Sequence, residues 1–465
     1  MKQLFSLYAA CALLVFATGC DKYKDRISPA NQEKVFIKYF GHVYSQKAAD
    51  IKQLPDKGYI LFGSTTSFVA SGDRGTYNNY YLVRTDSLGN ELWSKQFGNS
   101  LYDDVACRVI LLPGGGFLLA GTRQKIEFQE GANQYLRKQK RIYLIETDKD
   151  GLLVRDKIHA ARGVLEADEV DYQVNDLVPY MVNGELDGYI LTGFTTNVNR
   201  GKPNFNPDID ELDLYTARIK LDLSSPWDRT YGFQGNDIGV SVDLGKNVII
   251  VTGSTETYPG NSTTNPKNEI RVVKYEPANG GIIAQVAYSD PAIQLEAFDA
   301  CYDTTKQVLT MLCGSSSTAS TALNGLAFMQ ATVPDNLGSN DIVRLQNTNP
   351  VILTNGTSKN AGSNSVGAYI ELYPNDNGFL VTSTSIRSVG INSDVHLMRL
   401  DKNLSVQWDW LFGAGATLDV AGRAFTMKDN GGNPTGYALT GTFDLGTNEM
   451  IGLVKVTGGG SLTIQ

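Results

Sequence analysis

Residue types that could carry acid–base or metal chemistry are few and scattered along this chain of 465 residues. The three histidines, His42, His159 and His396, lie in separate parts of the sequence, and no spacing brings two of them together. A Zn²⁺ site or a Ser-His-Asp arrangement would have to draw on them. We therefore expect structural roles for all three histidines, and we predict no catalytic residue and no cofactor.

Clusters of acidic residues suggest two weaker possibilities. The segment "NPDIDELD", 206–213, places Asp208 and Asp210 where they could offer oxygen ligands to Ca²⁺, but it lacks the glycine and the distal glutamate of an EF-hand loop. A solvated loop is the preferred interpretation, and no metal site is predicted. "TDKDG", 147–151, stands between two apolar runs and is typical of a hairpin turn.

Three cysteines outside the N-terminal segment, Cys107, Cys301 and Cys313, form no CxxC motif and no adjacent pair. We expect them to be small buried hydrophobic residues. Cys301 and Cys313 flank one predicted hairpin turn, but pairing about that turn would not place them opposite each other.

A repeated phrase indicates which elements hold these residues. "YILFGS" at 59–64 returns as "FLLAGT" at 117–122, "YILTGF" at 189–194, "IIVTGS" at 249–254 and "YALTGT" at 437–442. The glycine, or its replacement, falls at seven positions 58 to 72 residues apart, which are Gly63, Gly121, Gly193, Gly253, Gly314, Ser383 and Gly441. Each unit contains four short runs rich in Val, Ile, Leu and Tyr, separated by turn residues. Four strands repeated at a period of about 60 residues predict an all-β, seven-bladed β-propeller with four-stranded antiparallel blades over residues 35–465.

The hairpin "YLVRTDSLGNELWSKQFG", with Asp86, Gly89 and Trp93, resembles the delta-60-type and quinoprotein-like propeller repeats of bacterial exported proteins. "LMRLDKNLSVQWDWLFG", with Trp408, repeats the pattern, and "IKLDLSSPWDRTYG", with Trp227, does so loosely. The resemblance implies that these tryptophans dock one blade on the next. It implies little about function, because such repeats specify a fold far better than an activity.

The N-terminal segment predicts export and lipid attachment. "MKQLFSLYAACALLVFATGC" has one lysine and an apolar run that is too short to span a bilayer, as in a secretory signal peptide. Its ending resembles the bacterial lipobox, although Ala17 replaces the preferred leucine. We expect residues 1–19 to be a lipoprotein signal peptide, Cys20 to carry the lipid, and residues 20–34 to form the lipidated cysteine and tether. A plain signal peptide is the alternative. The expected location is the bacterial cell envelope, lipid-anchored and at the outer membrane.

Ring closure must join the last blade to the first, since an open ring would expose strand edges. "VFIKYFG", 35–41, aligns with "LWSKQFG", 92–98. We therefore predict that residues 35–40 are the outer strand of the final blade.

A binding face is expected on the long links between second and third strands in the first four units, because binding residues commonly lie on loops held by a rigid scaffold. Its candidate residues are Phe68, Arg74, Tyr77, Phe128, Tyr135, Arg137, Lys138, Arg200, Phe205 and Tyr258.

The net charge of −8, with no block of five or six like charges, argues against a nucleic-acid surface. We expect a membrane-anchored binding or scaffolding module for a protein or glycan partner. The alternative is a polysaccharide-active hydrolase or lyase using loop carboxylates, for which the candidates are Asp103, Asp104, Asp168 and Asp237.

Overall fold

The computed structural model describes residues 35–459 and Leu462, apart from gaps at 69–75, 130–133, 160–169, 197–211, 233–234, 258–266, 291, 318–322, 339–340, 345–349, 354–363, 374–377, 389–391, 414–416 and 430. Throughout these residues the regular elements are β-strands. A helix with the length and apolarity needed to cross a membrane does not occur among them. The predicted signal peptide and tether, including Cys20, lie outside the described residues.

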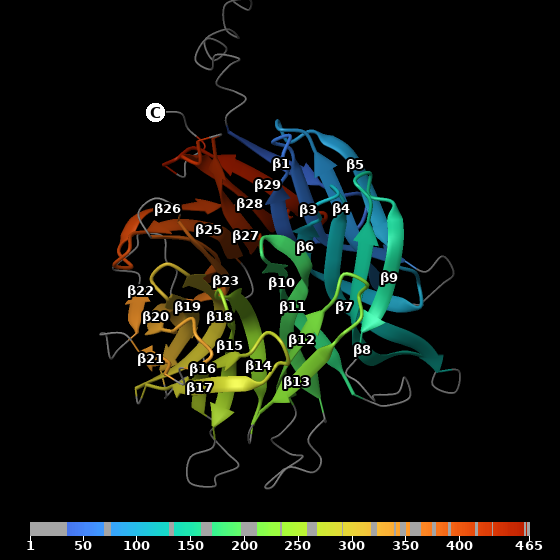
Figure 1. Cartoon of the computed structure of the whole chain (residues 1–465). Helices are drawn as coiled ribbons and strands as arrows, with labels where there is room; N and C mark the ends of the chain where they lie inside the picture. The colour runs from blue at the N-terminus through green and yellow to red at the C-terminus, as the bar shows by residue number, and fades with distance from the viewer. Residues whose placement is uncertain are drawn as a thin grey trace, which may run out of the picture.

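Seven antiparallel sheets form a ring, so the chain is a seven-bladed β-propeller, as predicted (Figure 1). From the innermost strand outward, blade 1 is β2 (Gln46–Gln53), β3 (Tyr59–Phe68), β4 (Thr76–Thr85) and β5 (Glu91–Phe97). Blade 2 is β6 (Tyr102–Leu111), β7 (Phe117–Gln129), β8 (Gln134–Thr147) and β9 (Leu153–His159). Blade 3 is β10 (Tyr172–Val182), β11 (Glu185–Thr196), β12 (Leu212–Ile219) and β13 (Trp227–Tyr231). Blade 4 is β14 (Asp237–Leu244), β15 (Ile249–Thr257), β16 (Lys267–Tyr275) and β17 (Ile282–Tyr288).

The remaining blades follow the same order. Blade 5 is β18 (Ile293–Asp303), β19 (Val308–Ser317) and β20 (Leu323–Thr332), whose outer edge pairs with the short strands β21 (Val343–Arg344) and β22 (Val351–Leu353). Blade 6 is β23 (Asn364–Leu372), β24 (Phe379–Ser388), β25 (Asn392–Leu400) and β26 (Val406–Phe412). Blade 7 is β27 (Val420–Lys428), β28 (Pro434–Asp444), β29 (Glu449–Val456) and β1 (Phe36–Phe40).

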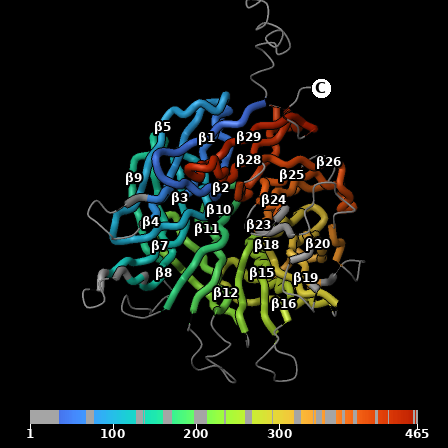
Figure 2. The backbone as a smooth tube through the Cα atoms, turned by 180° about the vertical axis from the view of Figure 1, so that it is seen from behind, coloured from blue at the N-terminus to red at the C-terminus, as the bar shows by residue number. Residues whose placement is uncertain are grey.

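The ring closes between the two ends of the chain, as predicted. Strand β1 pairs antiparallel with β29, with Phe36 opposite Lys455 and Phe40 opposite Ile451. Figures 1 and 2 show the blue N-terminal strand beside the red C-terminal blade from both sides. The first strand in the sequence is therefore the outermost strand of the last blade.

The hydrophobic core is divided among the seven contacts between neighbouring blades. Among the described residues, seven clusters of buried side chains each join two adjacent sheets. One of them packs Ile51 and Leu61 of blade 1 against Ile451 and Leu453 of blade 7. Because each sheet buries both faces against neighbours, similar apolar residues recur at similar positions in each unit.

In several blades, the glycine of the repeated phrase lies where the first two strands approach each other closely. A Cβ added at Gly121 would lie 2.1 Å from the carbonyl oxygen of Val105, and one added at Gly253 would lie 2.2 Å from that of Ile238. Neither distance is compatible with a side chain, so glycine is required there.

The hydroxyl residue that follows the glycine links one blade to the next. The backbone N–H of Ala106 donates to Ser64 Oγ at 2.8 Å, and that of Ala297 donates to Ser254 Oγ at 2.8 Å. The same contact joins Ala48 to Thr442 Oγ1 across the ring closure, at 2.9 Å. The repeated Gly-Ser or Gly-Thr pair therefore supports both the packing within a blade and the hydrogen bonding between blades.

Three tryptophans dock neighbouring blades, as the sequence resemblance implied. The ring of Trp93 packs on Phe117 of blade 2, with 6.3 Å between ring centroids. The indole N–H of Trp227 donates to Pro277 O of blade 4 at 3.0 Å. Trp408 packs on Tyr437 of blade 7, with 5.2 Å between centroids. All three therefore support interblade packing.

Candidate binding sites along the central channel

The two faces of the ring carry different links between strands. Links between strands one and two, and between three and four, emerge on one face, which we call the turn face. Asp86 closes one such turn, accepting hydrogen bonds from the N–H groups of Leu88 and Asn90 at 2.9 and 2.8 Å. Asp148 of "TDKDG" acts in the same way toward Asp150 and Leu152, which confirms the predicted hairpin turn. The other links emerge on the opposite face, the loop face.

The innermost strands line a central channel, and each carries an irregularity in its pairing. The register with the second strand shifts between Ala48 and Asp50 in β2, and between Ala106 and Arg108 in β6. Equivalent shifts occur in β10, β14, β18, β23 and β27. A β-bulge bends its strand and redirects side chains. The bulges therefore bring a ring of side chains from seven blades toward the channel.

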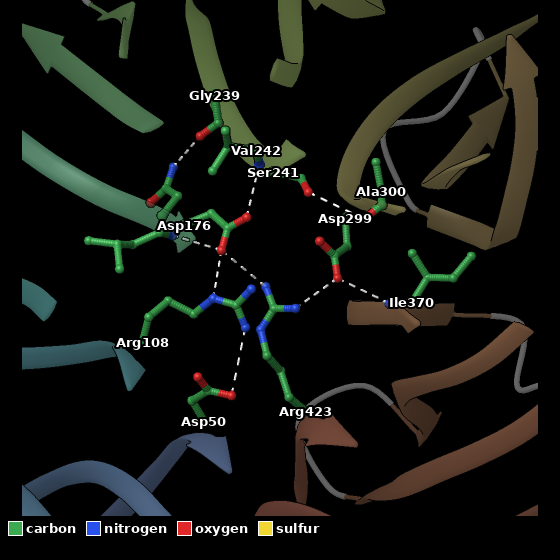
Figure 3. Close-up of polar contacts among 12 residues, drawn as sticks. Asp50, Arg108, Asp176, Gly239, Ser241, Val242, Asp299, Ala300, Ile370 and Arg423 are labelled. Carbon is green, nitrogen blue, oxygen red and sulfur yellow. Dashed lines mark hydrogen bonds and ion pairs between the residues drawn. The ribbon is translucent and has the colours of Figure 1, made fainter. Parts of the chain in front are cut away.

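Six charged residues meet in the channel, and we call them the charged belt: Asp50, Lys52, Arg108, Asp176, Asp299 and Arg423. Lys52 Nζ lies 2.9 Å from Asp50 Oδ1, and Asp50 Oδ1 lies 3.7 Å from Arg108 Nη1. Arg108 Nε donates to Asp176 Oδ1 at 2.6 Å (Figure 3). Arg423 continues the series, with Nη2 3.8 Å from Asp176 Oδ1 and Nη1 3.0 Å from Asp299 Oδ2. Charges alternate along the belt, which as a whole is neutral.

The carboxylates of the belt also hold neighbouring blades by their backbones. Asp50 Oδ2 accepts from the N–H of Val109, and Asp176 Oδ2 accepts from that of Val242. These bonds measure 3.0 and 2.9 Å. Burial favours the neutral form of Asp50, but Lys52, Arg108 and Arg423 outweigh burial and lower its pKa to about 2. The belt is thus an ion-pair network that joins blades.

Two cavities lie on either side of the belt. The loop-face cavity, of about 470 Å³, is lined by the beginnings of the innermost strands, for example Val105, Gln173 and Val240. The turn-face cavity, of about 380 Å³, is lined by their ends, for example Lys52, Asp243 and Glu371. Arg423 and Tyr369 line both, and the Arg423 guanidinium lies over the Tyr369 ring, 4.5 Å from its centroid. The belt and this stacked pair therefore separate the two cavities.

The wall of the loop-face cavity combines amide groups with aromatic rings. Gln124, Gln173 and Asn175 supply the amides, and Phe298 and Tyr369 supply the rings. Gln173 Nε2 donates to Asn175 Oδ1 at 3.1 Å, and Asn175 Nδ2 donates to Gly239 O at 2.8 Å, which orients both side chains. Amides both donate and accept hydrogen bonds, so this wall suits a ligand with hydroxyl groups.

The sequence-predicted binding face differs from this cavity. Phe68, Tyr77, Phe128, Tyr135, Arg137 and Lys138 were expected on loops, but they lie on strands β3, β4, β7 and β8. Register explains the correction, because β7 and β8 continue as a ladder as far as Phe128 opposite Tyr135 and Gln129 opposite Gln134. Arg74, Arg200, Phe205 and Tyr258 lie outside the described residues.

Of the described side chains in that predicted set, Tyr77 and Lys138 are half-buried, and neither lines the loop-face cavity. Sequence reasoning missed Gln124, Gln173 and Asn175. Gln173 and Asn175 could have been predicted from the sequence. They lie in the strand-like run "YQVNDLVPY", where polar residues alternate with apolar ones.

The candidate loop carboxylates take structural contacts. Asp103 lines the loop-face cavity and accepts from both the backbone N–H and Nδ2 of Asn78 at 2.8 Å. Asp104 is buried and forms a two-bond pair with Arg123, each bond 2.7 Å long. Asp237 is buried at the start of β14, and Asp168 lies outside the described residues. Among the described residues that line this cavity, Asp103 is the one carboxylate.

The histidines have structural surroundings. His159 is buried beside Tyr215 Oη at 2.9 Å, and burial lowers its pKa to about 4. His396 lies between Ser383 Oγ, 3.5 Å from Nδ1, and Asp409 Oδ2, 3.1 Å from Nε2. This Ser-His-Asp series was not foreseen, and it follows from strand register, since Ser383 pairs directly with His396. Both residues are completely buried within blade 6, where a substrate could not reach them.

The described cysteines form no disulfide, and the described residues include no cluster of metal ligands. Cys107, Cys301 and Cys313 are free thiols, and Cys301 pairs with Thr310 rather than with Cys313, as expected. Asp208 and Asp210 lie outside the described residues. Within the described part of the chain, no three His, Cys, Asp or Glu side chains are grouped to hold a metal ion.

Comparisons with known proteins return structures of low identity. No family model and no curated protein matches the chain. Similar solved structures include the Dos1 propeller, with 11% identity, a TM-score of 0.45 and coverage of 93% of this chain and 98% of that one. The parainfluenza virus 5 hemagglutinin-neuraminidase ectodomain has 10% identity, a TM-score of 0.43 and coverage of 98% and 96%. The Penicillium chrysogenum alpha-L-arabinanase complexed with arabinobiose has 11% identity, a TM-score of 0.41 and coverage of 91% and 98%. Strand pairing in this chain, rather than these likenesses, establishes the propeller.

Proposed function

We propose that this protein is a lipid-anchored, extracytoplasmic binding module whose loop-face cavity takes a sugar unit of a glycan. The observation that carries the proposal is the cavity wall, where Gln124, Gln173 and Asn175 offer amides beside the ring of Phe298. Sugar hydroxyl groups need partners that both donate and accept, and sugar carbon faces pack on aromatic rings. A volume of about 470 Å³ lies within the usual range for small-ligand sites.

Binding without catalysis is the better-supported form of this proposal. Glycoside hydrolysis generally uses two carboxyl groups on either side of the scissile bond. Asp103 is the one carboxylate on the described wall of the loop-face cavity, and it accepts two hydrogen bonds from Asn78. The described wall of this cavity therefore lacks the second carboxyl group that a glycoside hydrolase would need.

Glycan binding can be tested by titration calorimetry of the soluble propeller with neutral oligosaccharides. Gln173→Leu should weaken binding about tenfold or more, because the loss of one good hydrogen bond costs about 1.4 kcal/mol. The matched control is Lys149→Ala on the turn face, where the side chain is exposed and no loss is expected. Equal binding by wild type and Gln173→Leu would refute the proposed site. Hydrolysis of a polysaccharide that stops in Asp103→Asn would favour the enzyme.

The position of β1 is compatible with a lipid anchor. Phe36, its first residue, pairs with Lys455 near the end of β29, and the end of a third strand lies on the turn face. A tether over residues 20–34 would therefore join the ring at its perimeter and on the turn face. Anchoring from that side would direct the loop-face cavity away from the membrane.

Lipid attachment is expected to depend on the thiol of Cys20, which would form the thioether. In Cys20→Ser, labelled fatty acid should no longer be incorporated, and the protein should leave the membrane fraction. Cys107→Ser is the control, and it should retain the label. Retention of labelled fatty acid by Cys20→Ser would show that the lipid is carried elsewhere.

A further inference from the structure

The turn-face cavity is lined by more carboxyl groups than basic groups. Within the charged belt, three carboxylates and three cations are paired with one another. Two additional carboxyl groups line the same cavity, Asp243 on β14 of blade 4 and Glu371 on β23 of blade 6. Among the described residues, no Lys, Arg or His side chain lies within ion-pair distance of either one. Neither carboxyl group therefore has a direct ion-pair partner, although Arg108 acts on Asp243, and Lys52, Lys428 and Arg423 act on Glu371, from a greater distance.

Hydrogen bonding to these two groups is incomplete as well. Asp243 Oδ1 accepts from the N–H of Tyr302 at 3.1 Å, but Oδ2 is buried and has no hydrogen-bond partner. Glu371 accepts one long bond, of 3.5 Å, from the N–H of Thr426. A buried carboxylate oxygen without a donor is costly. A ligand that brings N–H donors and positive charge would satisfy both deficits at once.

The pKa shifts of the two carboxyl groups agree with this geometry. Burial raises the pKa of Asp243 well above its ordinary value, and the nearby carboxylates of Asp299 and Asp176 raise it further. Burial also raises the pKa of Glu371, to about 7. Both shifts favour the protonated forms, whereas a bound cation would favour the ionised forms and promote the release of protons.

We propose that the turn-face cavity binds a small organic cation, a primary ammonium or guanidinium compound, through Asp243 and Glu371. The cavity, at about 380 Å³, is too large for a bare metal ion and falls within the size range of small-molecule sites. Apolar side chains, including Val178, Leu372 and Phe425, line the same space and would contact the carbon skeleton. Phe425 also offers an aromatic face to a cation.

This site is separate from the proposed glycan site. It lies on the other side of the charged belt, and it shares only Arg423 and Tyr369 with the loop-face cavity. Failure of glycan binding would therefore leave the cation proposal standing, and the reverse is also true.

Calorimetry of the soluble propeller with n-butylammonium and with methylguanidinium tests the proposal, with n-butanol as the neutral analogue. Saturable binding of at least one cation is expected near pH 7, with proton release seen as a binding heat that depends on the buffer. Asp243→Asn and Glu371→Gln should each weaken binding about tenfold or more. Asp150→Asn, an exposed acid of the turn face outside the cavity, is the matched control and should bind as wild type does.

Folding of each variant is checked by its melting temperature, and the two amide variants give independent tests if one fails to fold. Absence of saturable cation binding to wild type between pH 6 and 9 would overturn the proposal. Equal affinity for n-butanol, or unchanged cation affinity in a folded amide variant, would overturn it too.

Discussion

Glu371 shows how one half-buried carboxyl group links the cavity to stability. Its pKa in the folded protein is about 7, against an ordinary value of 4.5, because burial disfavours its charge. Between these pH values the folded state holds a proton that the unfolded state releases. The stability contributed by this group is therefore complete below about pH 4.5 and is lost as the pH rises through about 7.

Glu371→Gln should remove this dependence, because the amide resembles the protonated acid and does not ionise. We expect the variant to match wild type at pH 4 and to exceed it by about 1 to 3 kcal/mol at pH 8. Denaturant unfolding at the two pH values measures the difference, with Glu185→Gln, an exposed acid, as the control. An advantage of the same size at both pH values would contradict the raised pKa.

At the residue scale, the sequence predicts the residues that pack the blades better than the residues that line the cavities. The anchor glycines and the docking tryptophans recur in equivalent units, so repetition alone exposes them. The charged belt repeats only in part. Its three aspartates and Arg108 each follow the bulge of an innermost strand. Arg423 instead reaches Asp176 and Asp299 across the channel, a contact that no repeat in the sequence indicates. A partial signal existed, because Asp50 and Arg108 each stand 13 positions before an anchor glycine and interrupt an apolar run.

Strand β1 is the element on which the closure of the ring depends. Its five residues pair with β29, and Phe40 joins the cluster between blades 7 and 1. Without β1, the outer edge of β29 would be exposed. The clearest success of the sequence prediction is this element, because alignment with the fourth strand of blade 1 identifies both its limits and its place.

Deletion of residues 21–40 should therefore destabilise the propeller, whereas deletion of residues 21–34 should not. We expect the longer deletion to lower the melting temperature by several degrees at least, since it removes a paired strand and the buried ring of Phe40. Differential scanning calorimetry of the two truncated proteins and wild type measures this. Equal melting temperatures for all three would mean that β1 contributes nothing to closure.

Elements were misjudged where polar strands extend beyond the ring. A long loop was expected between the second and third strands of blade 2, yet β7 and β8 continue as a hairpin as far as Gln129 and Gln134. Its alternation of polar with apolar residues, as in "KIEF", is typical of strands, but its many charges resemble those of a loop. The other strands can be recognised by the apolar residues that they bury between blades. This feature does not help to identify strand segments that extend beyond the ring.

At the scale of the whole molecule, the charged belt joins blades that are far apart in sequence. Arg423 of blade 7 contacts Asp176 of blade 3 and Asp299 of blade 5 across the channel. Removing one partner of a buried ion pair leaves the other charge without compensation, which costs far more than losing an exposed pair. The central contacts therefore supplement the contacts between neighbouring blades.

Arg423→Met should lower the free energy of unfolding by about 3 to 5 kcal/mol, because Asp176 and Asp299 would lose a buried cation. Arg155→Met is the matched control: its partner is Glu146 near the surface, and about 1 kcal/mol or less is expected. Chemical denaturation at pH 7 measures both. A cost for Arg423→Met no greater than that of the control would show that the belt does not hold the ring.

The pairing of β1 with β29 also sets an order of events during synthesis. Phe36 is made long before Lys455, the residue with which it pairs. Blades 1 to 6 can assemble once their own strands are available, but blade 7 must wait for β29 before it can pair with β1. A chain that stops before Glu449 keeps β1 as an unpaired strand, ready to associate with other chains. The ring therefore cannot close in a product that lacks β29.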